Sequence, residues 1–365
     1  MDDMKFGIEH EVALVRNGKF LDFSNTSFDE MDSWLKKLPV YGEDRLRKDR
    51  LGIMEKRWYV EGYERFTDDG KLASYLPKGI EIRTNPEPTI ARATDQLKSD
   101  YGLLEAALRL ENIATTWISY HPYRGRFVPA PPFSRYELEK FRESPDDSTA
   151  HIAQLSFGPD LSVSLSGLSD ERIIDLGRKL IALSPFLIPY SFSSPFYRER
   201  LWPGLSVRTY IRSGRRQAVR VFVRDAPKDS PPFVQKARFP GEIGRIEFKS
   251  FDSCQDPALY ASLLSVLKGL LLDKKLTVRA NAPDLRLHRL AALKNFGDGS
   301  IKTGTLQALE AAKEALINDP DISRLDPLFE IVRSGKIPGQ ILATRFSEIG
   351  SIAETLNLFP SLILS

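Results

Sequence analysis

The stretch KFGIEHEVALV, from Lys5 to Val15, decides the fold that we predict for this chain. Apolar and polar residues alternate along it, which is typical of a β-strand whose successive side chains point to opposite faces of a sheet. One face carries Phe6, Ile8, His10, Val12 and Leu14, and the other carries Gly7, Glu9, Glu11 and Ala13. Two carboxylates therefore lie side by side on the face that does not join the core, and His10 is expected to be a packed core histidine.

The same pattern occurs in two further stretches. In KGIEIRT, from Lys78 to Thr84, two isoleucines and a threonine oppose a glutamate and an arginine. In GRIEFKSFD, from Gly244 to Asp252, an isoleucine and a phenylalanine oppose an arginine, a glutamate and a lysine. A solvated outer face would explain one such strand. Three of them favour a functional interpretation, because like charges on neighbouring strands repel and need a compensating cation.

A metal ion can supply that compensation. Carboxylate oxygens are the hard ligands that Mg²⁺ prefers, and Mg²⁺ usually keeps coordination positions for water and substrate phosphates. The predicted metal ligands are Glu9, Glu11, Glu81 and Glu247. The cations on the same faces, which suit phosphate oxygens, are Arg83, Arg245 and Lys249. Carboxylates and cations on a rigid sheet are what phosphoryl transfer requires, since that chemistry depends on positioning and charge neutralisation.

Helical periodicity elsewhere completes the predicted fold. Apolar residues at three- and four-residue spacing predict helices at about 95–111, 170–187, 257–272, 305–317 and 347–358. Helices and strands do not alternate strictly, which favours an α+β fold: an antiparallel sheet with one acidic active-site face and helices packed on the other. We expect a catalytic domain over residues 1–300 and a C-terminal helical segment over 301–365 packed on the same domain.

Composition limits the class of protein. The chain has 365 residues, 42% hydrophobic and 28% charged, which is the balance of a globular protein. No apolar run approaches the roughly 20 residues that span a bilayer, and the start MDDMKF lacks the features of a signal peptide, so we expect a cytoplasmic protein without membrane partners. The single cysteine, Cys254, excludes a disulfide within the chain.

The net charge of +3 is well short of a dedicated nucleic-acid binder. Two basic stretches, 45–50 and 212–220, are interpreted mainly as solvated faces, with attraction of an anionic substrate as the alternative. The chain has no GxxxxGK[ST] loop, no GxGxxG after a strand, no HExxH and no GxSxG. Common nucleotide, zinc and serine-hydrolase motifs are therefore set aside.

Six segments, taken in chain order, resemble the bacterial type-2 glutamate-cysteine ligases and their relatives, the carboxylate-amine ligases, which share a glutamine-synthetase-like fold. The similar segments are GIEHEVALV (7–15), IEIRTNP (80–86), YHPY (120–123), ALSPFLIPYSFSSPFYRE (182–199), GLSVR (204–208) and GRIEFKSFD (244–252). Two departures stand out. QLSFG, at Gln154 to Gly158, stands where the family has an H-V-H-V-G strand, so Gln154 and Ser156 replace histidines, and Lys249 replaces an arginine.

The resemblance implies an ATP- and Mg²⁺-dependent ligase that forms an amide through an acyl phosphate, with small amino-acid substrates. Glutamate and cysteine are the leading pair, which would give γ-glutamylcysteine, the precursor in glutathione biosynthesis. The implied substrate-binding residues are Arg208, His121, Gln154 and Ser156. A further acidic ligand would come from Glu61 or Glu64, and the spacing does not decide between them.

Two other functions remain open at this point. The first is a divergent, non-catalytic or regulatory ligand-binding member of the same fold, motivated by the changes at QLSFG and Lys249. The second, ranked well below it, is a nucleic-acid binder, motivated by the two basic stretches. Assembly into a homo-oligomer is left open.

Overall fold

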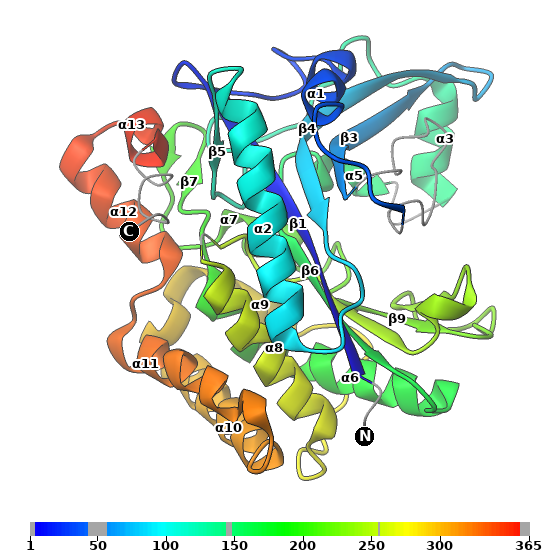
Figure 1. Ribbon diagram of the computed structural model, residues 1–365, viewed down its shortest axis with the longest axis vertical. Coiled ribbons are helices and arrows are strands. Elements are labelled where there is room, and N and C mark those ends of the chain that lie inside the picture. Colours follow the sequence, from blue (N-terminus) through cyan, green and yellow to red (C-terminus); the bar gives the residue numbers. More distant parts are fainter. Residues whose placement is uncertain (1–3, 43–56, 144–147, 255, 358–365) are drawn as a thin grey trace.

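A curled, mostly antiparallel sheet with helices on one side forms the body of the protein (Figure 1). The computed structural model describes residues 4–42, 57–143, 148–254 and 256–357. Within this part of the chain, nine strands join one sheet in the order β10-β9-β11-β6-β1-β4-β3, with β2 and β5 also paired to β1. Its pairings are antiparallel except for β10 with β9. The predicted mixed fold with an antiparallel sheet is thus confirmed at this level.

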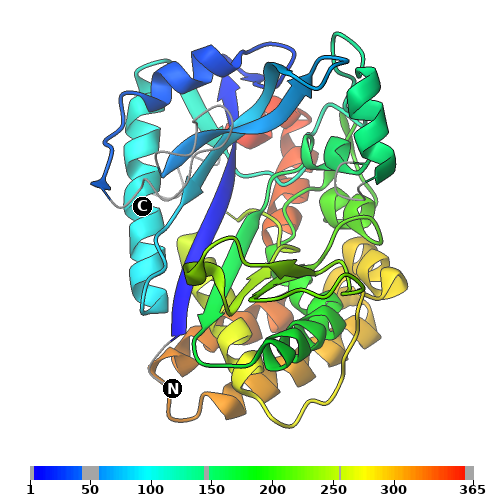
Figure 2. The ribbon, with the colours of Figure 1, turned by 90° about the vertical axis from the view of Figure 1, so that its right-hand side faces the viewer.

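The strand β1 lies at the centre of the sheet. It pairs with β6 through its first half and with β4 and β5 through its second half. In Figure 2, β1 (blue) runs beside β6 (green), and the β3–β4 hairpin crosses the upper part of the molecule. The strands of the sheet are β1 (Met4–Arg16), β2 (Lys19–Phe20), β3 (Trp58–Phe66), β4 (Leu72–Arg83), β5 (Ile113–Thr116), β6 (Pro159–Leu165), β9 (Val219–Val223), β10 (Val234–Lys236) and β11 (Arg245–Phe248). A separate pair consists of β7 (Phe196–Tyr197) and β8 (Arg200–Leu201).

The alternation predicted for β1 is present in the structure. Ile8 and Val12 are at most 2% exposed and belong to the main core, whereas Glu9 and Glu11 lie on the other face. His10 is fully buried, as expected, and burial lowers the pKa of its ring to about 3. Its Nδ1 forms a 2.9 Å hydrogen bond with the Tyr260 hydroxyl. One strand therefore supplies both the core and the polar face.

A neutral polar cluster lies beneath β1 in the core. The Tyr260 hydroxyl also accepts a 3.0 Å hydrogen bond from the backbone N–H of Cys254. Burial raises the pKa of the Cys254 thiol well above its ordinary value. The cysteine is thus a small core residue and not an activated nucleophile.

Three long helices cover the core face of the sheet. Helix α2 packs on β1, α8 packs on β6, and α6 packs on β9, while α10 packs outside α8 and α6 (Figure 1). The helices are α1 (Phe28–Leu35), α2 (Ile90–Arg109), α3 (Arg135–Glu143), α5 (Ala150–Ala153), α6 (Asp170–Leu187), α7 (Val207–Arg212), α8 (Pro257–Leu272), α9 (Leu285–Lys294), α10 (Gly299–Ala315), α11 (Asp326–Ser334), α12 (Pro338–Ile349) and α13 (Ile352–Asn357). Short 3₁₀ segments are η3 (Ile188–Ser191), η4 (Pro240–Glu242), η5 (Asn295–Gly297) and η6 (Pro320–Leu325).

Local capping explains where helix prediction succeeded and where it failed. The predicted helices 170–187 and 257–272 match α6 and α8, whose N-caps Ser169 and Asp256 accept backbone N–H bonds. The prediction of one helix over 347–358 was wrong, because Gly350 (φ 77°) ends α12 in the left-handed conformation and α13 begins two residues later.

Helices α10 and α11 share the main core. Leu309 of α10 and Leu328 of α11 are fully buried in the same cluster as the sheet residues. The division into residues 1–300 and 301–365 remains a prediction. In the described part of the chain, no helix combines the length and the apolar character needed to cross a membrane.

Candidate active site

A cavity of about 1030 Å³ lies over the polar face of the sheet. Strands β1, β3, β4, β6, β9, β10 and β11 all contribute lining residues, together with α7 and the loop around η4. Acidic and basic side chains are mixed along the strands beneath it, and α7 adds further arginines. The charged lining residues are Lys5, Glu9, Glu11, Arg57, Glu61, Glu64, Lys78, Glu81, Arg83, Asp160, Arg208, Arg212, Arg216, Arg220, Lys236, Arg238, Glu242, Arg245, Glu247 and Lys249.

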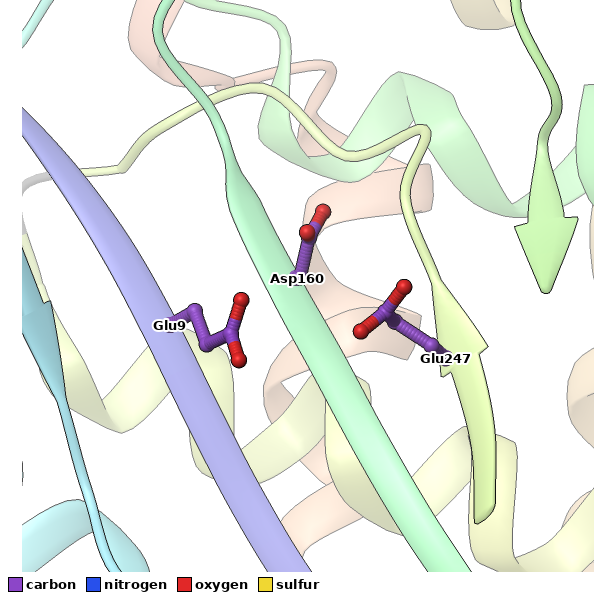
Figure 3. Close-up of side chains that lie close together, drawn as sticks. All are labelled: Glu9, Asp160 and Glu247. Atoms are coloured by element: carbon purple, nitrogen blue, oxygen red, sulfur yellow. The ribbon is translucent and has the colours of Figure 1, made fainter. Parts of the chain in front are cut away.

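The first group of carboxylates, here called the central trio, consists of Glu9, Asp160 and Glu247 (Figure 3). They come from the adjacent strands β1, β6 and β11, and Glu9 stands directly opposite Asp160 in the β1–β6 pairing. One oxygen of each lies within 4.8 Å of the others. In Figure 3, Glu9 and Glu247 point toward each other across β6, which carries Asp160 between them. Such a set of oxygens fits a divalent cation.

The second group, here called the hairpin trio, consists of Glu11, Glu61 and Glu81, and one oxygen of each again lies within 4.8 Å of the others. They come from β1 and the β3–β4 hairpin, and Glu11 stands directly opposite Glu81. Glu81 accepts hydrogen bonds from the Tyr59 hydroxyl and from Arg83 Nε, the latter at 2.9 Å. The hairpin trio is therefore already tied into neighbouring side chains.

Lysine and arginine side chains balance the central trio. Lys249 Nζ donates to Asp160 and, at 3.1 Å, to Glu247. Arg245 approaches Glu247 to 3.5 Å and Glu9 to 3.9 Å. The Glu9 carboxylate accepts no hydrogen bond from the residues that the structure describes, and Arg83 Nε is 3.8 Å away. Glu9 thus keeps its oxygens available for a cation in the cavity.

Burial shapes the protonation of these acids. It raises the pKa of Glu61 to about 7, against an ordinary value of 4.5, although Lys78 opposes the shift. It also raises the pKa of Glu81 well above the ordinary value and raises that of Glu247. For Asp160 burial also acts to raise the pKa, but the charge and hydrogen bond of Lys249, together with the charges of Arg212 and Arg220, outweigh it, so the pKa is lowered. A divalent cation would favour the ionised forms of all these groups.

Arginines form one wall of the cavity beside the central trio. Arg208 and Arg212, from α7, both donate to the carbonyl of Lys249, and Arg208 also donates to Phe251 O at 2.7 Å. Burial, together with the like charges of Arg208 and Arg216, lowers the pKa of Arg212 well below its ordinary value. Crowded guanidinium groups of this kind favour an anionic ligand.

The structure brings most of the predicted site residues together in this cavity. The predicted residues that line it are Glu9, Glu11, Glu81, Glu247, Arg83, Arg245, Lys249, Arg208 and Ser156. Of the two acids left open for a further ligand, Glu61 joins the hairpin trio, and Glu64 lines the cavity outside both trios.

Two of the predicted substrate-binding residues lie outside the cavity. His121 is buried beside Asp22, with Nε2 at 2.9 Å from its carboxylate, and its Nδ1 accepts from the backbone N–H of Tyr123 and Arg124. Gln154 donates to Leu76 O at 2.9 Å. Both side chains support neighbouring loops, so the structure gives no contact through which they would touch a ligand in the cavity.

QLSFG, which stands where the similar family has a strand, forms no named strand of the sheet here. Gln154 is the C-cap of α5, and the chain becomes a strand only at Pro159. The strand beside β1 is β6, and it supplies Asp160, which the sequence analysis missed. Alternation in PDLSVSL, with Asp160, Ser162 and Ser164 on one face, was the signal that could have found it.

Lys78 was also missed, although it lies within a predicted strand.

The basic stretch 45–50 lies outside the described residues. Of the second basic stretch, Arg212, Arg216 and Arg220 line the cavity, so this part is not simply a solvated face.

No protein-family model matches the chain, and no curated protein matches it. Solved structures with a similar fold include the complex between the prokaryotic ubiquitin-like protein Pup and its ligase PafA, at 11% identity over 95% of this chain and 69% of that chain, with a TM-score of 0.47. A novel glutamine synthase homolog shows 13% identity over 90% and 70%, with a TM-score of 0.40. GmaS without ligand shows 13% identity over 91% and 69%, with a TM-score of 0.41. At TM-scores below 0.5, these likenesses assign neither a family nor an activity to the chain.

Proposed function

We propose that this protein is an ATP- and Mg²⁺-dependent carboxylate-amine ligase. The observation that carries the proposal is the central trio, whose three carboxylates converge in a large cavity walled by arginines. Phosphoryl transfer to a carboxylate requires acidic residues that can hold a divalent cation and, next to them, basic residues that can hold phosphates. The sequence resemblance to carboxylate-amine ligases supports the choice of acceptor.

In this proposal the metal and phosphate roles fall to neighbouring side chains. Glu9, Asp160 and Glu247 hold Mg²⁺, which when bound neutralises charge on the ATP phosphates. Arg83 and Arg245, which flank Glu9 on either side, bind phosphate oxygens and orient the transferred group. No side-chain nucleophile is needed.

The substrate carboxylate is assigned to the arginine wall. Arg208 is 3% exposed and donates to two backbone carbonyls, so it positions the chain around Lys249 and Phe251. Arg212 is less buried and is the better candidate for direct contact with the substrate. Among acid and amine pairs we propose glutamate and cysteine first, on the sequence resemblance, with γ-glutamylcysteine as the product.

The test is ADP formation by the purified chain with Mg²⁺, ATP and a panel of acid and amine pairs. We expect one pair to stimulate ADP release, and Glu247→Gln to abolish both this activity and Mg²⁺-dependent ATP binding. The matched control is Glu64→Gln, which removes an acid that lines the same cavity but belongs to neither trio. If the folded protein binds no Mg²⁺-ATP and no pair stimulates ADP release, the ligase proposal fails.

A second function is favoured by the lysines of the site. Lys249 and Lys78 already neutralise members of both trios, as would suit a ligand-binding protein that has no turnover. Such a protein would bind nucleotide tightly and release no ADP with any substrate pair. Calorimetry of ATP binding, run beside the ADP assay, separates the two functions.

A further inference from the structure

The most unusual contact in the cavity is made by Lys78, whose position depends on an irregularity in β4. In a regular strand, side chains alternate, so Lys78 would point to the same face as Ile80, into the core. Pairing between β3 and β4 shifts at this point, however: Glu61 pairs with Gly79, and Gly62 pairs with Pro77. Lys78 is therefore the extra residue of a β-bulge, a device that re-aims a side chain.

The bulge depends on Gly62. A Cβ at this position would lie 2.2 Å from Leu76 O and 2.8 Å from Pro77 Cα, so only glycine allows the two strands to approach so closely. As a result, Lys78 turns to the polar face and its ammonium enters the hairpin trio. Its Nζ lies 2.6 Å from Glu11 Oε1 and 3.9 Å from Glu61 Oε1.

Every proton of the Lys78 ammonium has a fixed acceptor. Besides Glu11, Nζ donates to Ser156 O at 2.9 Å and to Ala153 O at 3.1 Å. The side chain is only 3% exposed. An ammonium has three protons and no more, so these three acceptors satisfy it completely. If it moved away, the buried carbonyl of Ser156 would lose this donor, which would be costly, and the carbonyl of Ala153 would keep the backbone N–H of Ser156.

The acids around Lys78 are occupied in the same way. The second oxygen of Glu11 accepts the backbone N–H of Gly158 at 2.8 Å, and Glu81 is held by Tyr59 and Arg83. A metal ion in the hairpin trio would have to displace this whole arrangement. The residues present therefore fit a lysine ammonium at this position better than they fit a second metal ion.

Lys249, in the central trio, makes a clear contrast. Its Nζ donates only to two carboxylates, Asp160 and Glu247, and to no backbone carbonyl among the described residues. Its side chain is 14% exposed and borders the open cavity. It can turn toward the cavity when a cation arrives, without leaving a backbone group unpaired.

We propose that Lys78 is the resident cation of the hairpin trio, so that the protein binds one divalent metal ion, in the central trio, and uses an ammonium group in place of a second. This inference rests on the metal-dependent function proposed above. Lys78 acts through Glu11 and Glu61 as a positioning residue, and Lys249 competes with the ion at the central trio.

The test is a count of Mn²⁺ ions bound by the full chain without nucleotide, measured by equilibrium dialysis with electron paramagnetic resonance of the free ion. We expect one ion per chain in the unmodified protein. Glu247→Gln should lose it, and Glu81→Gln should keep it, because only the first residue belongs to the central trio. These two variants test the inference even if changes at Lys78 disturb folding.

Lys78→Met and Lys249→Met form the matched pair, since each removes an ammonium and keeps most of the side-chain length. We expect Lys78→Met to bind two ions, and to gain more thermal stability from Mn²⁺ than the unmodified protein gains. Lys249→Met should still bind one ion, at least several-fold more tightly. Circular dichroism in chelator checks that both variants are folded, and Lys78→Gln replaces Lys78→Met if that variant is not.

The outcomes separate this inference from the proposed function. The role of Lys78 would be overturned if the unmodified protein bound two ions. It would also be overturned if Glu81→Gln lost the single ion and Glu247→Gln kept it. Either result would still be compatible with a metal-dependent ligase. No Mn²⁺ bound by the unmodified protein would overturn the metal site itself, and with it both proposals.

Discussion

The two faces of β1 place their side chains in different surroundings. On the core face, Ile8 and Val12 pack under the helices and His10 is held neutral by burial. On the cavity face, Glu9 and Glu11 stand among lysines and arginines. Neighbouring residues in the sequence thus belong to two environments, because the side-chain period of a strand is two. Changes at Ile8 and Val12 should alter stability, whereas changes at Glu9 should alter ligand binding first.

Ile8→Ala should have the largest effect on stability. Ile8 is 1% exposed and lies in the main core, and truncation of a buried isoleucine costs about 2–5 kcal/mol through lost burial and the cavity left behind. Urea unfolding followed by circular dichroism would measure the change in the free energy of unfolding. A loss below about 1 kcal/mol would mean that the core face of β1 is less tightly packed than the structure shows.

The free energy of unfolding should depend on pH because of His288, which lies in the helix layer. This histidine of α9 is buried against Ser184 of α6, and burial lowers its pKa to about 4 from an ordinary 6.5. Between these values the unfolded chain binds the extra proton, so stability is fully present above about pH 6.5 and falls with decreasing pH, by up to about 1.4 kcal/mol per pH unit.

The measurement compares the free energy of unfolding from pH 4.5 to 7.5 in the unmodified protein and in His288→Gln. Below pH 6.5, the free energy of unfolding of the variant should fall less steeply with decreasing pH than that of the unmodified protein. Above pH 7 the two proteins should show the same dependence on pH. Parallel curves throughout would show that His288 does not carry this dependence.

Glu9→Gln should have the smallest effect on stability and a large effect on binding. The Glu9 side chain is 25% exposed and its nearest cations lie at 3.8 and 3.9 Å, so in the absence of metal the free energy of unfolding should change by no more than about 0.5 kcal/mol. Mg²⁺-dependent ATP binding, measured by calorimetry, should be lost. A change in melting behaviour as large as that of Ile8→Ala would instead assign Glu9 a structural role and remove the contrast between the two faces.

Alternation predicted much of the sheet but not the relation between its strands. The acidic faces of β1, β4 and β11 could be read from residues such as Glu9, Glu81 and Glu247, since each lies in a stretch where side chains alternate regularly. Which acids meet depends on register, which a single strand does not encode. Asp160 was missed because its strand begins directly after an irregular turn, and Lys78 because a bulge reverses the face that alternation predicts.

Helices could be predicted from the sequence only where they are long and well capped. Helices with strong capping residues and a broad apolar face, such as α6 and α8, could be delimited from the sequence alone. Short helices such as α5 and α7 carry too few residues for a periodic pattern. The ligand contacts predicted for Gln154 and Arg208 came from the resemblance; in the structure Gln154 bonds to a backbone carbonyl outside the cavity, and Arg208 lines the cavity while it donates to two backbone carbonyls.

The lone cysteine allows local opening of the structure to be measured by thiol labelling. Cys254 is 1% exposed, and its thiol has a raised pKa, so thiol-reactive dyes can reach it only when the surrounding layer opens. With no other cysteine in the sequence, the labelling rate measures that opening without any engineering of the chain. Because the reporter lies beneath β1, on the side away from the cavity, a slower rate with bound nucleotide would reveal how far ligand binding tightens the fold.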